Sequence, residues 1–271
     1  MKLICCADDF AISDAVTEGI LKCARDGILT QTGLFSNMPG SKYAVMRLKS
    51  EAPHICLGQD INLVAGRPVT DPSLIPSLVQ SNGMFKTSSM HKKLDKENPH
   101  HVTYDDAYLE TENQVKRFIE LVGHIPDYLQ GHSYESYEIK KAYQDIAQKY
   151  CITLASDVYT SLGMPSAKPF FPWIGADVSN KFDLNDQLSL NIIQLFKEGK
   201  MKHLEEALKN NGITRIHTHA GFVDEDLFRR STYTIVRAKE VEFLCSYEIK
   251  TWVKENHVEL VSIRDLIANG L

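Results

Sequence analysis

The chain of 271 residues lacks a run of about 18 apolar residues, the length that a membrane-spanning helix needs. It has no block of basic residues, and its formal net charge is −5. Nucleic acid and acidic membrane surfaces are therefore not expected partners. Glycine-rich phosphate loops of the GxGxxG or Walker type are absent, and no serine or cysteine stands in a nucleophile-elbow sequence. These absences argue against a nucleotide cofactor and against a serine or cysteine nucleophile.

Six cysteines are present, and no two of them form a CxxC pair. Cys5 and Cys6 are adjacent, so they would point to opposite faces of a strand. The first residues lack a signal-peptide pattern, because Asp8 and Asp9 follow a very short apolar run. We therefore expect free thiols in a cytoplasmic protein.

The composition is that of an ordinary globular protein, with 43% hydrophobic and 24% charged residues. A chain of this length buries roughly three quarters of its unfolded surface, so its core needs neither a metal nor a disulfide. No repeat, low-complexity tract or domain boundary is evident. We expect a single domain over residues 1–271 with long loops at about 65–103 and 158–185, and long loops often bind ligands or close over them.

Strand-like and helix-like segments alternate along the whole chain. Short apolar runs predict strands at residues 3–7, 29–35, 55–64, 128–131, 152–155, 214–218 and 260–262. Apolar residues at helical spacing predict helices at 13–26, 43–49, 104–121, 137–150, 201–210 and 231–254. This alternation indicates an α/β fold with mostly parallel strands.

Polar residues gather where the predicted strands end. The groups are Asp8–Asp9, Gln59–Asn62, Gln130–His132 and His217–His219. In parallel barrels and open parallel sheets, that edge carries the active site. Carboxylates and imidazoles together suit a divalent metal beside an acid–base pair. Taken alone, Asp8 and Asp9 could also be simple turn or capping residues.

A series of motifs runs in a consistent order along nearly the whole chain. The first is Ala7-Asp8-Asp9-Phe10 with Ser13 after it, and the second is Gly58 to Asn62 followed by Gly66-Arg67-Pro68-Val69. Later matches are Ser77–Val79, Gly83, Phe85, Glu110, Gln114, Phe118, Pro126, His132, His219, Gly221, Asp224, Arg237 and Glu240. Together these motifs resemble the YdjC/ChbG family of carbohydrate deacetylases. The resemblance implies a distorted (β/α) barrel related to other polysaccharide deacetylases.

The resemblance also implies a reaction, namely metal-dependent removal of an N-acetyl group from a small oligosaccharide or sugar phosphate of the chitin or cellobiose type. Asp8 would be the general base and His219 the general acid, while Asp9, Asp60 and His132 would hold the metal. Both an acid and a base are needed, because an amide is a poor electrophile with a poor leaving group. A homodimer is a further expectation from the family.

The chain departs from the family pattern at the expected metal site. The family has a histidine where this chain has Asp60, and the histidines that usually follow the position of His132 are replaced. Two carboxylates shift the preference from Zn²⁺ toward Mg²⁺ or Mn²⁺, so we expect Mg²⁺, with Zn²⁺ or Mn²⁺ as alternatives.

Six further residues are candidates for substrate contact: Asn62, Arg67, Tyr134, His217, Trp173 and Arg237. Trp173 could stack on a sugar ring or could pack in the core. His217 could instead orient His219, and Arg67 could equally lie at the surface.

Two other functions stay open at this point. One is metal-dependent hydrolysis of a different bond, for example in a phosphorylated disaccharide, and the substitution at Asp60 motivates it. The other is a non-catalytic sugar-binding relative of the family. Retention of Asp8, Asp9, His132 and His219 favours an enzyme, so the sequence predicts a metal-dependent carbohydrate deacetylase.

Overall fold

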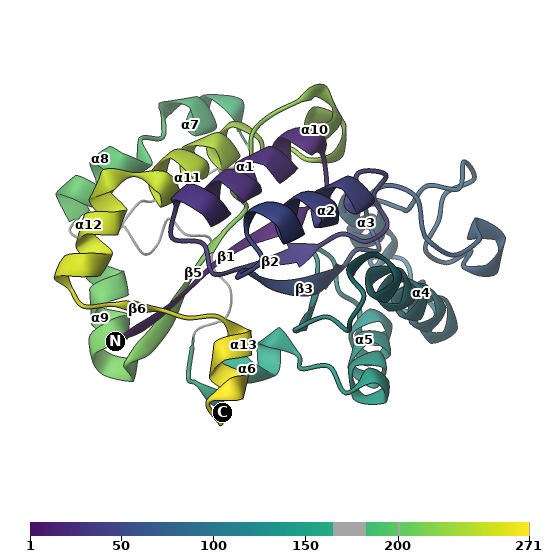
Figure 1. Cartoon of the computed structure of the whole chain (residues 1–271). Coiled ribbons are helices and arrows are strands. Elements are labelled where there is room, and N and C mark those ends of the chain that lie inside the picture. The colour runs from purple at the N-terminus through teal and green to yellow at the C-terminus, as the bar shows by residue number, and fades with distance from the viewer. Residues whose placement is uncertain (165–182, 200, 271) are drawn as a thin grey trace.

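A computed structural model of the chain, which describes residues 1–164, 183–199 and 201–270, has a six-stranded sheet (Figure 1). The strands are β1 (Lys2–Phe10), β2 (Gln31–Leu34), β3 (Cys56–Ile61), β4 (Leu129–Gly131), β5 (Ile213–Thr218) and β6 (Glu259–Leu260). Their order is β4-β3-β2-β1-β5, with β6 paired to the first residues of β1, and all these pairings are parallel. The carboxyl ends of β1 to β5 therefore meet along one edge of the sheet.

Strand β1 is at the centre of the sheet, and all its residues after Lys2 are buried. Its alternate residues face two different layers, as the two-residue period of a strand requires. Leu3, Cys5 and Ala7 belong to the largest hydrophobic cluster, whereas Ile4 belongs to a separate cluster on the other face. A strand that is covered on both faces has a continuous run of apolar residues in its sequence. Such a run at residues 3–7 predicted β1.

Helices cover the sheet. Helices α1 (Asp14–Asp26), α2 (Ser41–Glu51) and α11 (Ile235–Cys245) lie on one face (Figure 1), and α4 (Tyr104–Val122) and α5 (Tyr137–Tyr150) pack against each other beside β3 and β4. The other helices are the 3₁₀ turn η1 (Pro72–Leu74), α3 (Ser88–Leu94), α6 (Ala155–Ser161), α7 (Leu184–Ser189), α8 (Ile192–Gly199), α9 (Lys202–Asn211), α10 (Glu225–Arg230), α12 (Tyr247–Glu255) and α13 (Ile263–Ala268). None of the helices in the described residues is long and apolar enough to cross a membrane.

Helix α6 and helix α13 contribute to the cluster on the second face of the sheet, together with Ile4 and Tyr128. Tyr159 of α6 accepts a hydrogen bond from Gln31 of β2 at 3.0 Å, and the guanidinium of Arg215 on β5 lies 3.6 Å from the centre of its ring. Within the described residues the two end strands, β4 and β5, do not pair with each other. The predicted α/β fold, a distorted barrel of mostly parallel strands, is thus confirmed, and α6 packs on the face of the sheet that carries Ile4 and Tyr128.

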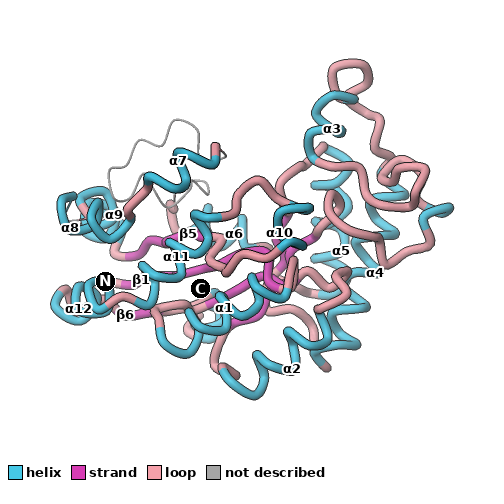
Figure 2. Tube along the Cα trace, turned by 90° about the horizontal axis from the view of Figure 1, so that it is seen from above, coloured by secondary structure: helices cyan, strands magenta, loops and turns pink. Residues whose placement is uncertain are grey.

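The structure differs from the sequence-based expectation in several segments. The strand predicted at 152–155 is reduced to a single bridge between Leu129 and Leu154, because Ala155, Val158 and Tyr159 are buried at helical spacing and start α6. The expected loop at 65–103 contains η1, α3 and a bridge between residues 79 and 85, and it projects beyond the rest of the molecule (Figure 2). The second expected loop, 158–185, begins inside α6, and its residues 165–182 lie outside the described part of the chain.

Candidate active site and metal centre

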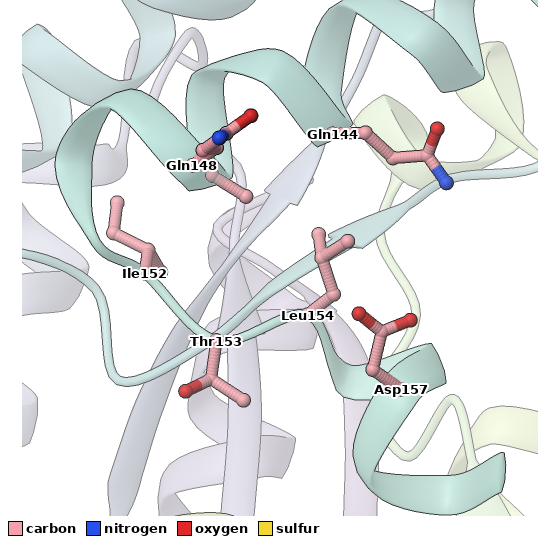
Figure 3. Close-up of a pocket in the computed structure, with 7 residues that line it drawn as sticks. Gln144, Gln148, Ile152, Thr153, Leu154 and Asp157 are labelled. Carbon is pink, nitrogen blue, oxygen red and sulfur yellow. The ribbon is translucent and has the colours of Figure 1, made fainter.

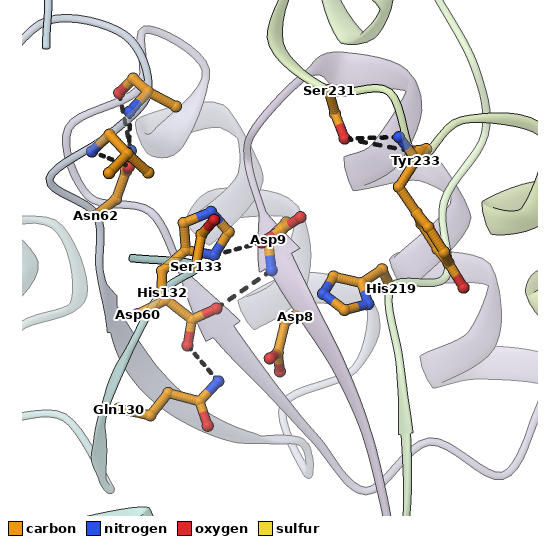
Figure 4. A network of polar contacts seen from close by, with 12 residues as sticks. Asp8, Asp9, Asp60, Asn62, Gln130, His132, Ser133, His219, Ser231 and Tyr233 are labelled. Atoms are coloured by element: carbon orange, nitrogen blue, oxygen red, sulfur yellow. Dashed lines mark hydrogen bonds and ion pairs between the residues drawn. The ribbon is translucent and has the colours of Figure 1, made fainter. Parts of the chain in front are cut away.

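The predicted polar residues meet at the carboxyl edge of the sheet. Asp8 and Asp9 come from β1, Asp60 comes from β3, and His132 and His219 follow β4 and β5. Figure 4 shows dashed contacts that join Asp9 to His132 and to Asp60, with Asp8 between the strands that carry Asp60 and His219. The parallel topology therefore brings together residues that are far apart in the sequence.

The backbone of β1 is irregular at the two aspartates. Its register against β2 shifts between Ala7 and Phe10, and Asp9 and Ala11 have positive φ angles of 69° and 77°. Such a bulge turns side chains away from the alternation of a regular strand. Asp8 points toward β5, whereas Asp9 points toward His132 and α11. Aspartate is among the residues that tolerate this left-handed backbone.

Asp9 lies between an arginine and a histidine side chain. Its Oδ2 accepts a hydrogen bond from Arg237 Nη2 at 2.6 Å, and its Oδ1 lies 3.1 Å from His132 Nδ1. Burial opposes ionisation of this carboxyl, but His132 and Arg237 together outweigh it and hold the pKa of Asp9 well below its usual value. Arg237 is itself buried and also donates to the carbonyl oxygens of Tyr233 and His219. The structure thus places this candidate substrate contact behind Asp9, where it fixes an anion.

Asp60 has the opposite environment. Its Oδ1 accepts from Gln130 Nε2 at 2.7 Å and its Oδ2 accepts from the backbone N–H of Asp9 at 3.2 Å. Burial, followed by the negative charges of Asp8 and Asp9, raises the pKa of Asp60 well above its usual value. Gly33 on the adjacent strand makes room for this carboxylate, because a Cβ at that position would lie 1.8 Å from Asp60 Oδ1.

Asp8 has few partners for a buried carboxylate. It is 8% exposed, its Oδ2 lies 3.3 Å from His217 Nε2, and its Oδ1 has no hydrogen-bond partner among the described residues. His217, a candidate for substrate contact, therefore sits beside the candidate base. On its other side, His217 Nδ1 lies 3.6 Å from the Sγ of Cys6.

His219 is held through its backbone. Its N–H donates to Glu240 Oε2 at 2.9 Å, and the Tyr233 hydroxyl donates to the other oxygen of Glu240 at 2.8 Å. The imidazole lies 5.2 Å from that of His217, measured between ring centres. Burial lowers the pKa of the His219 imidazole well below its usual value, although the Asp9 carboxylate opposes the shift. A proton on this ring would therefore depend on the counter-charge of Asp9.

The donors at this edge fit a divalent cation in chemical type. Asp9 Oδ1 is buried without a hydrogen-bond partner in the described residues, and it lies 3.1 Å from His132 Nδ1. Two ligand atoms of one cation, each about 2.0–2.2 Å from it, lie about 3 Å apart. In the described part of the chain, Asp9, Asp60 and His132 are not a group whose donor atoms all fall within 4.8 Å. A shared cation would therefore require Asp60 to turn from Gln130 toward Asp9 Oδ1.

The remaining candidates for substrate contact are more distant from this network or are occupied by protein groups. Asn62 is fully buried, and its side-chain amide is hydrogen-bonded within its own loop and to Asn37. Tyr134 is buried and donates its hydroxyl proton to Asp95 at 2.7 Å. Arg67 is exposed on the projecting segment, and Trp173 lies outside the described residues.

Several residues of the network were not assigned a role at the site from the sequence. Cys6 shares a strand face with Asp8 two residues later, so the two-residue period was a signal for it. Gln130 precedes His132 by the same spacing, but its bond to Asp60 depends on the pairing of β3 with β4. Nothing in the local sequence indicates that Tyr233 and Glu240 hold the backbone of His219.

A hollow on the surface lies elsewhere, between α5 and α6. It is lined by Gln144, Ala147, Gln148, Ile152, Thr153, Leu154 and Asp157 (Figure 3). It shares no residue with the group of Asp8, Asp9, Asp60, His132, His217 and His219 at the strand ends, here called the strand-end network, and it contains a single carboxylate. We therefore place the candidate site at the strand ends.

The sequence model of the YdjC-like protein family matches residues 2–255. The chain belongs to the YdjC-like family. Among curated relatives, a carbohydrate deacetylase of Oceanobacillus iheyensis is 30% identical over 262 residues, which cover 92% of this chain and 97% of the relative. A carbohydrate deacetylase of Thermoanaerobacter pseudethanolicus is 26% identical over 268 residues, covering 96% and 97% of the two chains.

A solved structure supports the fold of this YdjC-like chain. A protein of Enterococcus faecalis V583, named for cellobiose-phosphate cleavage, superposes with a TM-score of 0.74 and covers 98% of both chains. Its sequence identity is 23%, so the likeness concerns the fold alone. The family assignment predicted from the motifs is thus confirmed, and the relatives named as deacetylases indicate an enzyme family.

Proposed function

We propose that this YdjC-like protein is a metal-dependent hydrolase that removes an N-acetyl group from a small oligosaccharide or sugar phosphate of the chitin or cellobiose type. The observation that carries the proposal is the contrast between the surroundings of Asp8 and those of Asp9. One carboxylate, Asp8, keeps an unpartnered oxygen, while its neighbour Asp9 is held as an anion by Arg237. A hydrolase needs both a group that can take a proton and a fixed charge.

Each residue then has a role. Asp8 takes the proton of the attacking water through its unpartnered Oδ1. His219, on the β5 side of Asp8, gives a proton to the nitrogen of the departing amine (Figure 4). The Asp9 carboxylate is the counter-charge that favours a protonated His219 ring. Glu240 and Arg237 keep the backbone of His219 in position.

Asp9, Asp60 and His132 are the residues that would hold the divalent cation. Their two carboxylates and one imidazole favour Mg²⁺ over Zn²⁺, with Mn²⁺ as another candidate. When bound, the cation would supply Lewis-acid polarisation of the acetamide carbonyl.

The test is acetate release from N-acetylated chito-oligosaccharides, with and without phosphate, by chelator-treated protein supplied with Mg²⁺, Mn²⁺ or Zn²⁺. We expect release that depends on the added metal and is lost in Asp8→Asn. Glu255→Gln, an exposed carboxylate at the end of α12, is the matched control and keeps the activity.

Other outcomes would contradict the proposal. A folded protein that releases no acetate from any of these sugars, but cleaves another bond of a phosphorylated disaccharide, is a different hydrolase. Sugar binding without any turnover indicates a non-catalytic relative.

We also propose a cytoplasmic location and a homodimer. The six cysteines, all of them free, support a reducing compartment. Fractionation of cells that produce the protein tests the first, and light scattering of the purified chain tests the second.

A further inference from the structure

A second set of metal-binding side chains lies next to the proposed catalytic base. Cys6 and Asp8 are two residues apart on β1, so they share one face of the strand. His217 on β5 is the register partner of Cys6. The pairing of β1 with β5 therefore brings a thiol, a carboxylate and an imidazole to one place.

The geometry of these three groups is close to that of a metal site. One donor atom from each of Cys6, Asp8 and His217 can be chosen so that all three lie within 4.8 Å of one another. In a tetrahedral zinc site with bonds of about 2.0–2.3 Å, donor atoms lie about 3.3–3.8 Å apart. A movement of about 1 Å would therefore complete the site, and rotation of the His217 ring is one way to provide it.

The free oxygen of Asp8 is an independent sign that a ligand is missing. Asp8 is 8% exposed, one oxygen of its carboxylate faces His217, and its Oδ1 has no hydrogen-bond partner among the described residues. Buried polar atoms are rarely left without a partner. The thiol of Cys6 donates a weak hydrogen bond to the carbonyl oxygen of Ile216 at 3.3 Å, and its sulfur lies 3.6 Å from His217 Nδ1.

We propose that Cys6, Asp8 and His217 bind a thiophilic divalent cation of the Zn²⁺ class, at a site separate from Asp9, Asp60 and His132. Sulfur, nitrogen and oxygen donors together select zinc, whereas the all-oxygen-and-nitrogen set next to it suits harder cations. On binding, the Cys6 S–H bond breaks, the proton leaves to solvent, and the thiolate sulfur bonds to the cation.

This site does not depend on the reaction that the protein catalyses. Its consequence for the proposed function is competition, because a cation bound to Asp8 occupies the carboxylate that would otherwise accept a proton. Among the charged groups that act electrostatically on the Cys6 thiol, Arg215 is cationic, whereas Asp8 and Asp60 are carboxylates.

Co²⁺ is the probe, because a thiolate ligand gives it a charge-transfer absorption that oxygen and nitrogen ligands do not give. The chelator-treated full chain is titrated with Co²⁺ alone and then with Zn²⁺ as competitor. We expect the native chain to show this absorption and Zn²⁺ to remove it. Cys6→Ser should abolish it, while Cys56→Ser, which changes another buried thiol on β3, should keep it.

His217→Gln is the second variant, since it leaves the thiol in place and removes only the imidazole. Loss of a group that only hydrogen-bonds to a metal ligand weakens metal affinity about 10- to 100-fold, and loss of a ligand itself should weaken it at least as much. We therefore expect the Co²⁺ concentration at half-saturation to rise at least about tenfold.

Two results would overturn the proposal. One is the lack of a thiolate absorption in the folded native chain, and the other is an absorption that survives in Cys6→Ser. Should Cys6→Ser fail to fold by circular dichroism, an unchanged titration of His217→Gln overturns it instead. Acetate release enters none of these outcomes, so failure of the proposed function would be seen separately.

Discussion

Asp8 and Asp9 are adjacent in the sequence and have the same side chain, yet the protein surrounds them differently. Asp9 contacts Arg237 at 2.6 Å and His132 at 3.1 Å, and its pKa is held well below its usual value. Asp8 has only His217, at 3.3 Å, and one of its oxygens is without a partner in the described residues. Burial does not explain the difference, because the exposed fractions are 8% and 1%. The difference comes from the positive charge of Arg237, which lies beside Asp9 and not beside Asp8. We therefore assign Asp9 as the fixed anion and Asp8 as the group that accepts a proton.

The largest expected effect is on catalysis, through Asp8. Asp8→Asn keeps the size of the side chain but cannot take a proton, so kcat for deacetylation should fall about 10²- to 10⁴-fold. The urea midpoint should not fall, because the missing charge has no strong partner in the native state. Steady-state kinetics and urea unfolding measure the two effects, with Glu255→Gln as the control. If Asp8→Asn loses stability as well as activity, Asp8 is a structural anion and the contrast with Asp9 disappears.

The next effect is on stability, through the partner of Asp9. Arg237→Met fills a similar volume and leaves Asp9 buried without its closest counter-charge. Breaking a buried pair in this way costs about 3–5 kcal/mol of unfolding free energy. The matched control is Arg229→Met, because Arg229 pairs with Glu225 at the surface, with exposed fractions of 68% and 80%, and exposed pairs contribute little. Urea unfolding of the two variants compares them, and equal losses would mean that Asp9 is not held by Arg237.

The sequence predicted the location of this site better than its internal contacts. The strand-end rule gave Asp8, Asp60, His132 and His219, because parallel topology makes all strands end at one edge. The short helices α7 and α8 were not predicted, and the strand expected at 152–155 became the start of α6. The elements that were predicted had strong local signals, such as the Ser13 cap on α1.

The contacts that decide the chemistry could not be derived in this way. The bulge that turns Asp9 away from Asp8 depends on the register between β1 and β2. The pair between Arg237 and Asp9 joins residues 228 positions apart. Both follow from tertiary packing, and neither leaves a periodic pattern in the local sequence.

A third prediction compares the pH dependence of Asp60 with that of Asp9, in protein freed of metal. The pKa of Asp60 is raised, so its contribution to stability is present below the unfolded value of 3.8 and is lost as the pH rises through the folded value. The pKa of Asp9 is lowered, so its contribution is present above 3.8 and is lost as the pH falls through its folded value. Asp60→Asn cannot ionise. From pH 4 to pH 8 its unfolding free energy should therefore rise relative to that of the native chain.

Urea unfolding at several pH values checks this prediction. At each pH, the unfolding free energy of the native chain is subtracted from that of the variant, and the result is compared between pH values. This removes the part of the effect that does not depend on pH, because the amide also alters the bonds to Gln130 and to the backbone of Asp9. A difference that stays constant with pH would mean that Asp60 ionises as easily in the folded chain as in the unfolded one.

The smallest expected effect on stability comes from His132, the second partner of Asp9 besides Arg237. The side chain of His132 is 17% exposed, whereas that of Arg237 is 2% exposed, so solvent screens the pair between His132 and Asp9 more strongly. In metal-free protein, His132→Asn should therefore cost less than about 1 kcal/mol of unfolding free energy. If His132 is a metal ligand, the same variant should weaken Mg²⁺ or Mn²⁺ binding at least about tenfold in a calorimetric titration. A large loss of stability with unchanged metal affinity would reverse the assignment, making His132 a structural counter-charge like Arg237.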